Sequence, residues 1–237
     1  MELLLSLSPI SCTSDQIPIL LSSYSATLHP SDRAVLTLLQ RCETMAGVDM
    51  SPYQPLVWGN TALQHYNSNT NSWKQIKCSE ILGLLDSERM RRTCSKFPLH
   101  LHLDSEAEVN CDTILDNSAY DPRFILPLLS YLLSSEVYID KHMKFIEVGA
   151  LNLAFSAMSS KDRDMRCAGF HVVSKLDAAL EAAKLSQEKQ VWAHVISLLR
   201  LGIVTSSLTR EGRVSSIITQ VILYLQITCQ FAHCLIT

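Results

Sequence analysis

The feature that most constrains the fold is a pair of helix-like segments joined by a short polar turn, within residues 144–180. Gly149 opens the first segment, and Ser159 or Ser160 is expected to cap the second. The second segment has an apolar stripe at i, i+3 and i+4 spacing, formed by Met165, Ala168, Val172 and Leu176. Neither segment can bury its apolar face alone, so both need neighbouring helices.

Residues 122–135 and 187–201 have helical patterns that supply such neighbours. Asp121 is a candidate helix cap with Pro122 in the first turn, whereas Pro127 should bend the helix or shorten its first turn. Helix pairs of about 40 residues that stack on one another are typical of armadillo and HEAT repeats. Because strand patterns are nearly absent, we predict an all-α fold with an armadillo/HEAT-like helical repeat (α-solenoid) segment over 120–213.

The first half of the chain is more irregular. Helices are predicted within residues 31–45, with Ser31 as the N-cap, and as one run over residues 79–97. The second run ends in basic residues that complement the helix dipole, namely Arg89, Arg91, Arg92 and Lys96. Residues 65–73 form a polar, turn-rich loop.

The predicted domain organisation follows from these patterns and from the charge distribution. Residues 1–103 form an N-terminal helical and irregular part, and residues 104–119 form an acidic linker, with an acidic partner-binding segment as the alternative. The repeats occupy 120–213. Residues 214–237 form an uncharged apolar tail, for which a membrane anchor is the less favoured interpretation because Gln and His interrupt it.

The cysteines and the N-terminal residues indicate the cellular compartment of the protein. The eight cysteines contain no CxxC pair, and Cys42 and Cys167 fall in helix-like runs where free cysteine behaves as a small buried residue. These features favour a reducing compartment, the cytosol or nucleus. The apolar opening lacks Lys or Arg before Arg33, so a secretory signal is disfavoured.

The sequence offers only weak patterns for catalysis or metal binding. The seven glycines form no phosphate-binding loop, and neither GxSxG nor HExxH occurs. His171, Ser174 and Asp177 have the residue types of a triad, but their spacing points them away from a shared centre. A zinc set is weak because its spacing fits poorly; its members would be Cys94, His100, His102 and Cys111. We therefore expect a protein that is not an enzyme and that has no catalytic residue, cofactor or metal.

Charge is unevenly distributed, which gives a weak indication of phosphate contact. The formal net charge is -3, too acidic for a globally basic nucleic-acid binder. Residues 161–213 nevertheless hold nine Lys/Arg against six Asp/Glu. The candidate RNA or phosphate contacts are Lys161, Arg163, Arg166, Lys175, Lys184 and Lys189. A plain solvated helix face is the simpler alternative.

An ordered set of motifs resembles a known family. The motifs are Tyr120-Asp121-Pro122 followed by Phe124, Leu126 and Leu128; Lys144-Phe145 with Gly149-Ala150-Leu151; and Ser159 to Met165 with Arg166, Ala168 and His171. Two upstream segments, LLSSYSATLHPSDRAVLTLL and LVWGNTALQHY, fit the same domain of that family in order and spacing. Over roughly residues 18–215, and most specifically over 120–190, the chain resembles the C-terminal domain of the nucleolar pre-ribosomal-associated proteins.

The resemblance implies a function that the residue patterns alone do not show. Members of that family are very large helical-repeat factors of early large (60S) subunit assembly and pre-rRNA processing in the nucleolus. A chain of this kind would be a non-enzymatic scaffold whose partners are pre-ribosomal RNA and large-subunit assembly factors, without a small-molecule substrate. Because members are many times longer, we expect this chain to be a fragment or truncated form. The alternative is a general armadillo-type protein–protein adaptor without RNA contact.

Overall fold

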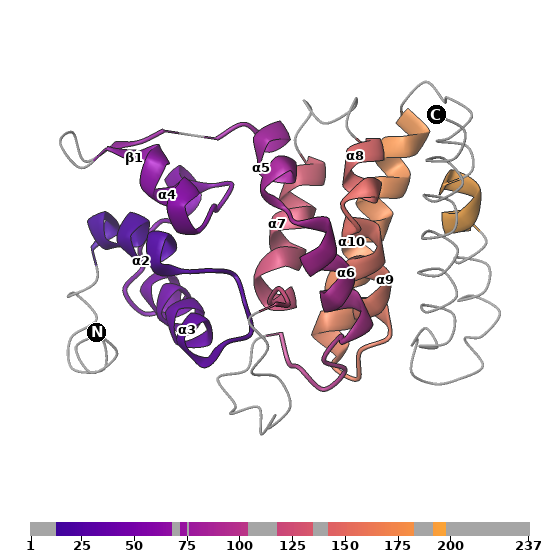
Figure 1. Cartoon of the computed structure of the whole chain (residues 1–237), viewed down its shortest axis with the longest axis horizontal. Coiled ribbons are helices and arrows are strands. Elements are labelled where there is room, and N and C mark those ends of the chain that lie inside the picture. Colours follow the sequence, from indigo (N-terminus) through magenta and orange to yellow (C-terminus); the bar gives the residue numbers. More distant parts are fainter. Residues whose placement is uncertain are drawn as a thin grey trace.

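The computed structural model describes residues 13–67, 72–74, 76–103, 118–134, 142–182 and 192–197. The predicted all-α class is confirmed, because the strands there are limited to the two-residue β1 and β2 (Figure 1). The elements are η2 (Ser14–Gln16), α2 (Ile17–Ser23), α3 (Pro30–Thr44), η3 (Ser51–Tyr53), α4 (Gly59–His65), β1 (Tyr66–Asn67), β2 (Ser72–Trp73), α5 (Cys78–Leu84), α6 (Ser87–Ser95), α7 (Pro122–Ser134), α8 (His142–Glu147), α9 (Ala150–Met158) and α10 (Arg163–Ala182).

The N-terminal elements pack together at one end of the molecule (Figure 1). Helix α2 contacts both α3 and α4, and it contributes the fully buried Ile17 and Leu21 to the core. The Tyr53 hydroxyl of η3 donates to the Ser14 carbonyl of η2 over 2.7 Å. Strands β1 and β2 form a small antiparallel hairpin that follows α4 directly.

Helices α6, α7, α8 and α10 pack around α9. Every residue of α9 is buried, and the helix contacts α6, α7, α8 and α10. Gly149 precedes α9 with a φ of 81°, a left-handed conformation that favours glycine. On α10, a Cβ at Gly169 would lie 2.7 Å from the Ala154 carbonyl oxygen. Glycine at this position therefore permits the close approach of α10 to α9.

Aromatic side chains join the two groups of helices. Phe124 of α7 makes edge-on contacts with Tyr24 and Trp58, at ring-centroid distances of 4.9 and 5.6 Å. The Asp121 amide donates to the Ala26 carbonyl over 2.8 Å, which ties the start of α7 to the α2–α3 connection. The two groups therefore share one continuous core, to which both contribute buried residues.

A buried ion pair stands at the same junction. The Arg123 guanidinium donates to both Asp121 carboxylate oxygens, at 2.6 to 3.1 Å, and both side chains are almost fully buried. The Asp121 carboxylate also accepts from the Arg123 amide over 2.9 Å, so Asp121 caps α7 as predicted. Pro122 occupies the first turn, and α7 continues through Pro127 to Ser134 without losing that turn.

Two predicted caps are wrong. The N-cap of α3 is His29, whose ring accepts from the Ser31 amide, because the helix begins at Pro30. At α10 the cap is Asp162, which accepts from the Met165 amide over 2.8 Å. Ser159 and Ser160 instead bond carbonyls of the Ser156 and Leu99 main chain.

The helix predicted over residues 79–97 is two helices. The chain breaks at Leu85 and Asp86, and the Asp86 carboxylate then accepts from the Arg89 amide over 2.6 Å as the N-cap of α6. Within the predicted loop 65–73, His65 ends α4, and residues 66–67 and 72–73 form the β1–β2 hairpin. The first difference arises because the Asp86 side chain bonds the local backbone.

Cysteine placement differs from expectation. Cys42 is buried in α3 as predicted, but it is disulfide-bonded rather than free. Cys167 is an exposed free thiol on α10 rather than a buried one.

In the described part of the chain no helix combines the length and apolar character needed to cross a bilayer. The linker residues 104–117, the tail 214–237 and the predicted helix 187–201, apart from 192–197, lie outside the described residues.

Candidate nucleic-acid interface

The turn between α9 and α10 is held against the loop that follows α6. The Lys161 amide donates to the Leu99 carbonyl over 2.8 Å, and the Ser160 hydroxyl donates to the same oxygen over 3.1 Å. The Ser160 hydroxyl in turn accepts from the Asp162 amide over 3.1 Å. These bonds fix the backbone from which Lys161 and Arg163 project.

Asp162 uses its charge inside this turn. Its carboxylate accepts from the amides of Met165 and Leu103, at 2.8 and 3.3 Å, and from the His102 ring over 2.9 Å. Burial acts to raise the pKa of Asp162, but the hydrogen bonds from Met165, His102 and Leu103 outweigh it and lower the pKa. The Asp162 carboxylate is therefore hydrogen-bonded to groups of the turn and of the loop after α6.

The basic side chains of the turn divide into two kinds. Arg166 donates to the carbonyls of Ser160 and Lys161, at 3.0 and 2.8 Å, and so stabilises the turn itself. The Lys161 ammonium is exposed and donates to the His100 ring over 3.0 Å. Arg163 is exposed at the first position of α10. Lys161 and Arg163 are thus directed to solvent, whereas Arg166 is structural.

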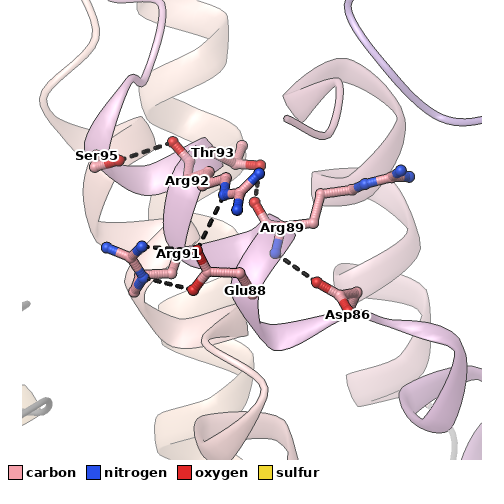
Figure 2. A network of polar contacts seen from close by, with 7 residues as sticks. All are labelled: Asp86, Glu88, Arg89, Arg91, Arg92, Thr93 and Ser95. Carbon is pink, nitrogen blue, oxygen red and sulfur yellow. Dashed lines mark hydrogen bonds and ion pairs between the residues drawn. The ribbon is translucent and has the colours of Figure 1, made fainter. Parts of the chain in front are cut away.

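A second basic group lies on α6. Arg91 donates twice to the Glu88 carboxylate, at 2.7 and 2.8 Å, and Arg92 donates to it over 3.0 Å (Figure 2). These bonds, first from Arg91 and then from Arg92, lower the pKa of Glu88 to about 2. Arg89 points away from this group in Figure 2, and its guanidinium lies 5.1 Å from the centre of the Tyr120 ring.

The loop after α6 connects the two basic groups, because its Leu99 carbonyl accepts from the Lys161 amide. Lys96 follows Arg92 by one helical turn, about 5.4 Å along the axis. Three peptide units separate Lys96 from Leu99, so their Cα atoms are at most about 11 Å apart. Since Leu99 bonds Lys161, the end of α6 and the α9–α10 turn lie at the same end of the layer (Figure 1). We call Arg91, Arg92, Lys161 and Arg163 the basic edge.

The remaining candidate contacts lie elsewhere. The Lys175 ammonium donates to the Ser130 carbonyl and hydroxyl, at 3.1 and 2.9 Å, and to the Ser134 hydroxyl. Lys175 therefore caps the C-terminal end of α7, where a cation is favoured. Lys184 and Lys189 lie outside the described residues. The structure brings Lys161, Arg163 and Arg166 together and separates Lys175 from them.

The zinc and triad candidates are placed as follows. Cys94 is buried, and burial raises the pKa of its thiol to about 12, while His100 and His102 are exposed and bonded to the α9–α10 turn. Cys111 lies outside the described residues. Within the described ranges no group of three or more His, Cys, Asp or Glu is arranged to hold a metal ion. His171, Ser174 and Asp177 are spread along α10.

Sequence reasoning assigned Arg91 and Arg92 to the helix dipole and missed their place on the basic edge. They precede Lys161 by about 70 residues, so spacing alone could not connect them. The available signal was the density of cations in the run Arg89 to Arg92, where three of four residues are arginine.

Two curated proteins are similar to this chain over most of its length. The chain is 32% identical to mouse (Mus musculus) nucleolar pre-ribosomal-associated protein 1 over 225 residues, which is 88% of the chain and 10% of that protein. It is 31% identical to the human (Homo sapiens) protein of the same name over 210 residues, 84% of the chain and 9% of that protein. No protein-family model and no solved structure matches the chain. The chain spans about a tenth of the length of these relatives, and it belongs to the family of nucleolar pre-ribosomal-associated protein 1.

Proposed function

We propose that the chain acts in ribosome biogenesis as a non-enzymatic scaffold, in early assembly of the large (60S) subunit and in pre-rRNA processing. The observation that supports this is its identity of 31–32% to nucleolar pre-ribosomal-associated protein 1, extended over more than four fifths of the chain. The names of those relatives support a nucleolar location. Because the relatives are about ten times longer, the role proposed here is that of one segment within a larger assembly surface.

The proposed mechanism is the presentation of a rigid helical surface to several partners. Helices α7, α9 and α10 contact one another, and every residue of α9 is buried. This packing supports the proposal of an armadillo/HEAT-like stack. Such a stack leaves its outer helix faces and turns available for pre-ribosomal RNA and for large-subunit assembly factors. It needs no cofactor and makes or breaks no covalent bond.

The experiment is affinity purification of the full tagged chain from nucleolar extract after ultraviolet crosslinking. Bound RNA is sequenced, and the co-purified proteins are identified by mass spectrometry. We expect enrichment of pre-rRNA together with large-subunit assembly factors over a tag-only control. Protein partners without RNA above the control would instead favour the adaptor function, and recovery of mature ribosomes alone would contradict a role in assembly.

A further inference from the structure

We propose that the basic edge, formed by Arg91, Arg92, Lys161 and Arg163, binds the phosphate backbone of single-stranded RNA. This inference deepens the proposed function and rests on it for the identity of the RNA in the cell. RNA binding is measured on the isolated chain, whereas the role in ribosome biogenesis is tested in nucleolar extract. Either proposal can therefore fail while the other holds. No base-specific recognition is included, because the edge offers cations rather than the paired donors and acceptors that read bases.

The placement of the four cations fits an extended polyanion. Arg92 and the α9–α10 turn are connected by one helical turn and three peptide units, so they are within about 20 Å of each other. A strand rises about 3.4 Å per stacked nucleotide, so at most about six phosphates span this distance. The backbone under Lys161 is fixed by its bond to Leu99, which limits the entropy lost when the side chain meets a phosphate.

Among the described residues, the anions near the basic edge are fewer than its cations. Asp162 is committed to Met165, Leu103 and His102, and its lowered pKa keeps it charged within the turn. Asp164 is exposed beside Arg163 and is the main opposing carboxylate there. Arg166, Lys96 and His100 add further donors or positive charge around the same turn. The described residues of this edge therefore carry more cations than anions.

Glu88 occupies the position that a phosphate would take on α6. Its carboxylate receives three N–H donors from Arg91 and Arg92, and all three side chains are about half exposed. Planar guanidinium groups bind phosphate with the same bidentate geometry that they use for carboxylate. Glu88 is therefore an internal competitor for RNA, and its removal should strengthen binding rather than weaken it.

The expected salt dependence follows from the number of contacts. For single strands the logarithm of affinity falls with the logarithm of salt concentration at a slope of about 0.7 per phosphate contact. Four contacts give a slope of about 2.8, so affinity should fall about 50-fold between 50 and 200 mM salt. With two of the four cations reversed, the same change in salt should weaken binding only about sevenfold.

The test uses the full chain and a fluorescein-labelled 12-nucleotide single-stranded RNA of mixed sequence, with binding followed by fluorescence anisotropy. One variant combines Lys161→Glu and Arg163→Glu, and a second carries Glu88→Gln. The matched control combines Lys74→Glu and Lys77→Glu, which makes the same change in net charge at exposed lysines before α5, away from the α9–α10 turn (Figure 1). Far-UV circular dichroism and urea midpoints establish that each variant is folded.

The proposal predicts three results together. The Lys161/Arg163 variant binds at least about tenfold more weakly at 50 mM salt with a reduced slope, Glu88→Gln binds about two- to fivefold more tightly, and the control binds as the original chain does. Equal losses in the control and in the Lys161/Arg163 variant would overturn the proposal, because binding would then depend on net charge alone. Absence of RNA binding at 50 mM salt, or equal displacement of RNA by poly-glutamate, would also overturn it.

Discussion

Gly169 is the position where one added methyl group should be most informative about the packing of α10 on α9. In the helix interior alanine is favoured over glycine by about 1 kcal/mol, so propensity alone predicts that Gly169→Ala is stabilising. The structure predicts the opposite. The added Cβ would lie 2.7 Å from the Ala154 carbonyl oxygen and 3.1 Å from both Ala157 Cβ and Met158 Cγ.

The magnitude follows from the kind of atom that the methyl group meets. A backbone oxygen in a fully buried helix cannot move as a flexible side chain can, so α9 and α10 must separate. Overpacking of this kind costs typically 1–3 kcal/mol, and we place Gly169→Ala at the upper end, about 3 kcal/mol. Subtracting about 1 kcal/mol of helix propensity leaves a net destabilisation of about 2 kcal/mol.

The matched control is the same substitution at Gly83 in α5. A Cβ there would meet only the Lys144 ammonium nitrogen, at an ordinary contact distance of 3.7 Å. Gly83→Ala should therefore gain up to about 1 kcal/mol from helix propensity. Both variants are compared with the original chain by urea unfolding at 25 °C, followed by far-UV circular dichroism. If Gly169→Ala proved as stable as Gly83→Ala, the inferred close approach of α10 to α9 would be refuted.

Three further predictions concern charge and cysteine. Asp121→Asn leaves the Arg123 guanidinium buried without its counterion, so urea unfolding should show a loss of about 3–5 kcal/mol, and a loss under 1 kcal/mol would contradict burial of the pair. Because the folded-state pKa of Glu88 is depressed to about 2, its contribution is present above its ordinary pKa of 4.5 and is lost as the pH falls toward 2; carbon-13 NMR should show this midpoint, and one near 4.5 would contradict the arginine contacts. At pH 8 iodoacetamide should label the exposed Cys167 well before Cys94, whose pKa burial raises to about 12; mass spectrometry of the peptides would show equal labelling if Cys94 were accessible.

Much of the helical architecture could be predicted because its signals are local. The Asp121-Pro122 pair starts α7, and Gly149 precedes α9 with a positive φ. In each case the residue type is set by a backbone requirement that acts within one turn of the helix. The apolar stripe of α10 was predictable for the same reason, since Met165, Val172 and Leu176 are buried against its neighbours.

Helix ends were less predictable, because several polar residues compete for each cap. Asp86, Ser159, Ser160 and Asp162 are all residue types that cap helices. Only tertiary structure distinguishes them. The Ser160 hydroxyl donates to the Leu99 carbonyl and so does not cap α10. The Asp162 carboxylate accepts from the Met165 amide instead. Ser160 follows Leu99 by 61 positions in the sequence, and nothing in the residues between them signals the first of these bonds.

The candidate interface could be predicted least, because a charge in the sequence does not reveal where its side chain is used. Lys161 and Lys175 are the same residue type, yet the Lys175 ammonium donates to Ser130 and Ser134 at the end of α7. The exposed Lys161 ammonium instead donates to the exposed His100 ring. The Arg166 guanidinium likewise donates to the main-chain carbonyls of Ser160 and Lys161. An excess of cations in a segment therefore overstates the positive charge left for a phosphate, and the surface that we propose adds Arg91 and Arg92 from α6. It follows that Arg91 and Lys161, rather than the lysines along α10, are the positions where changes of charge should alter RNA binding without loosening the fold.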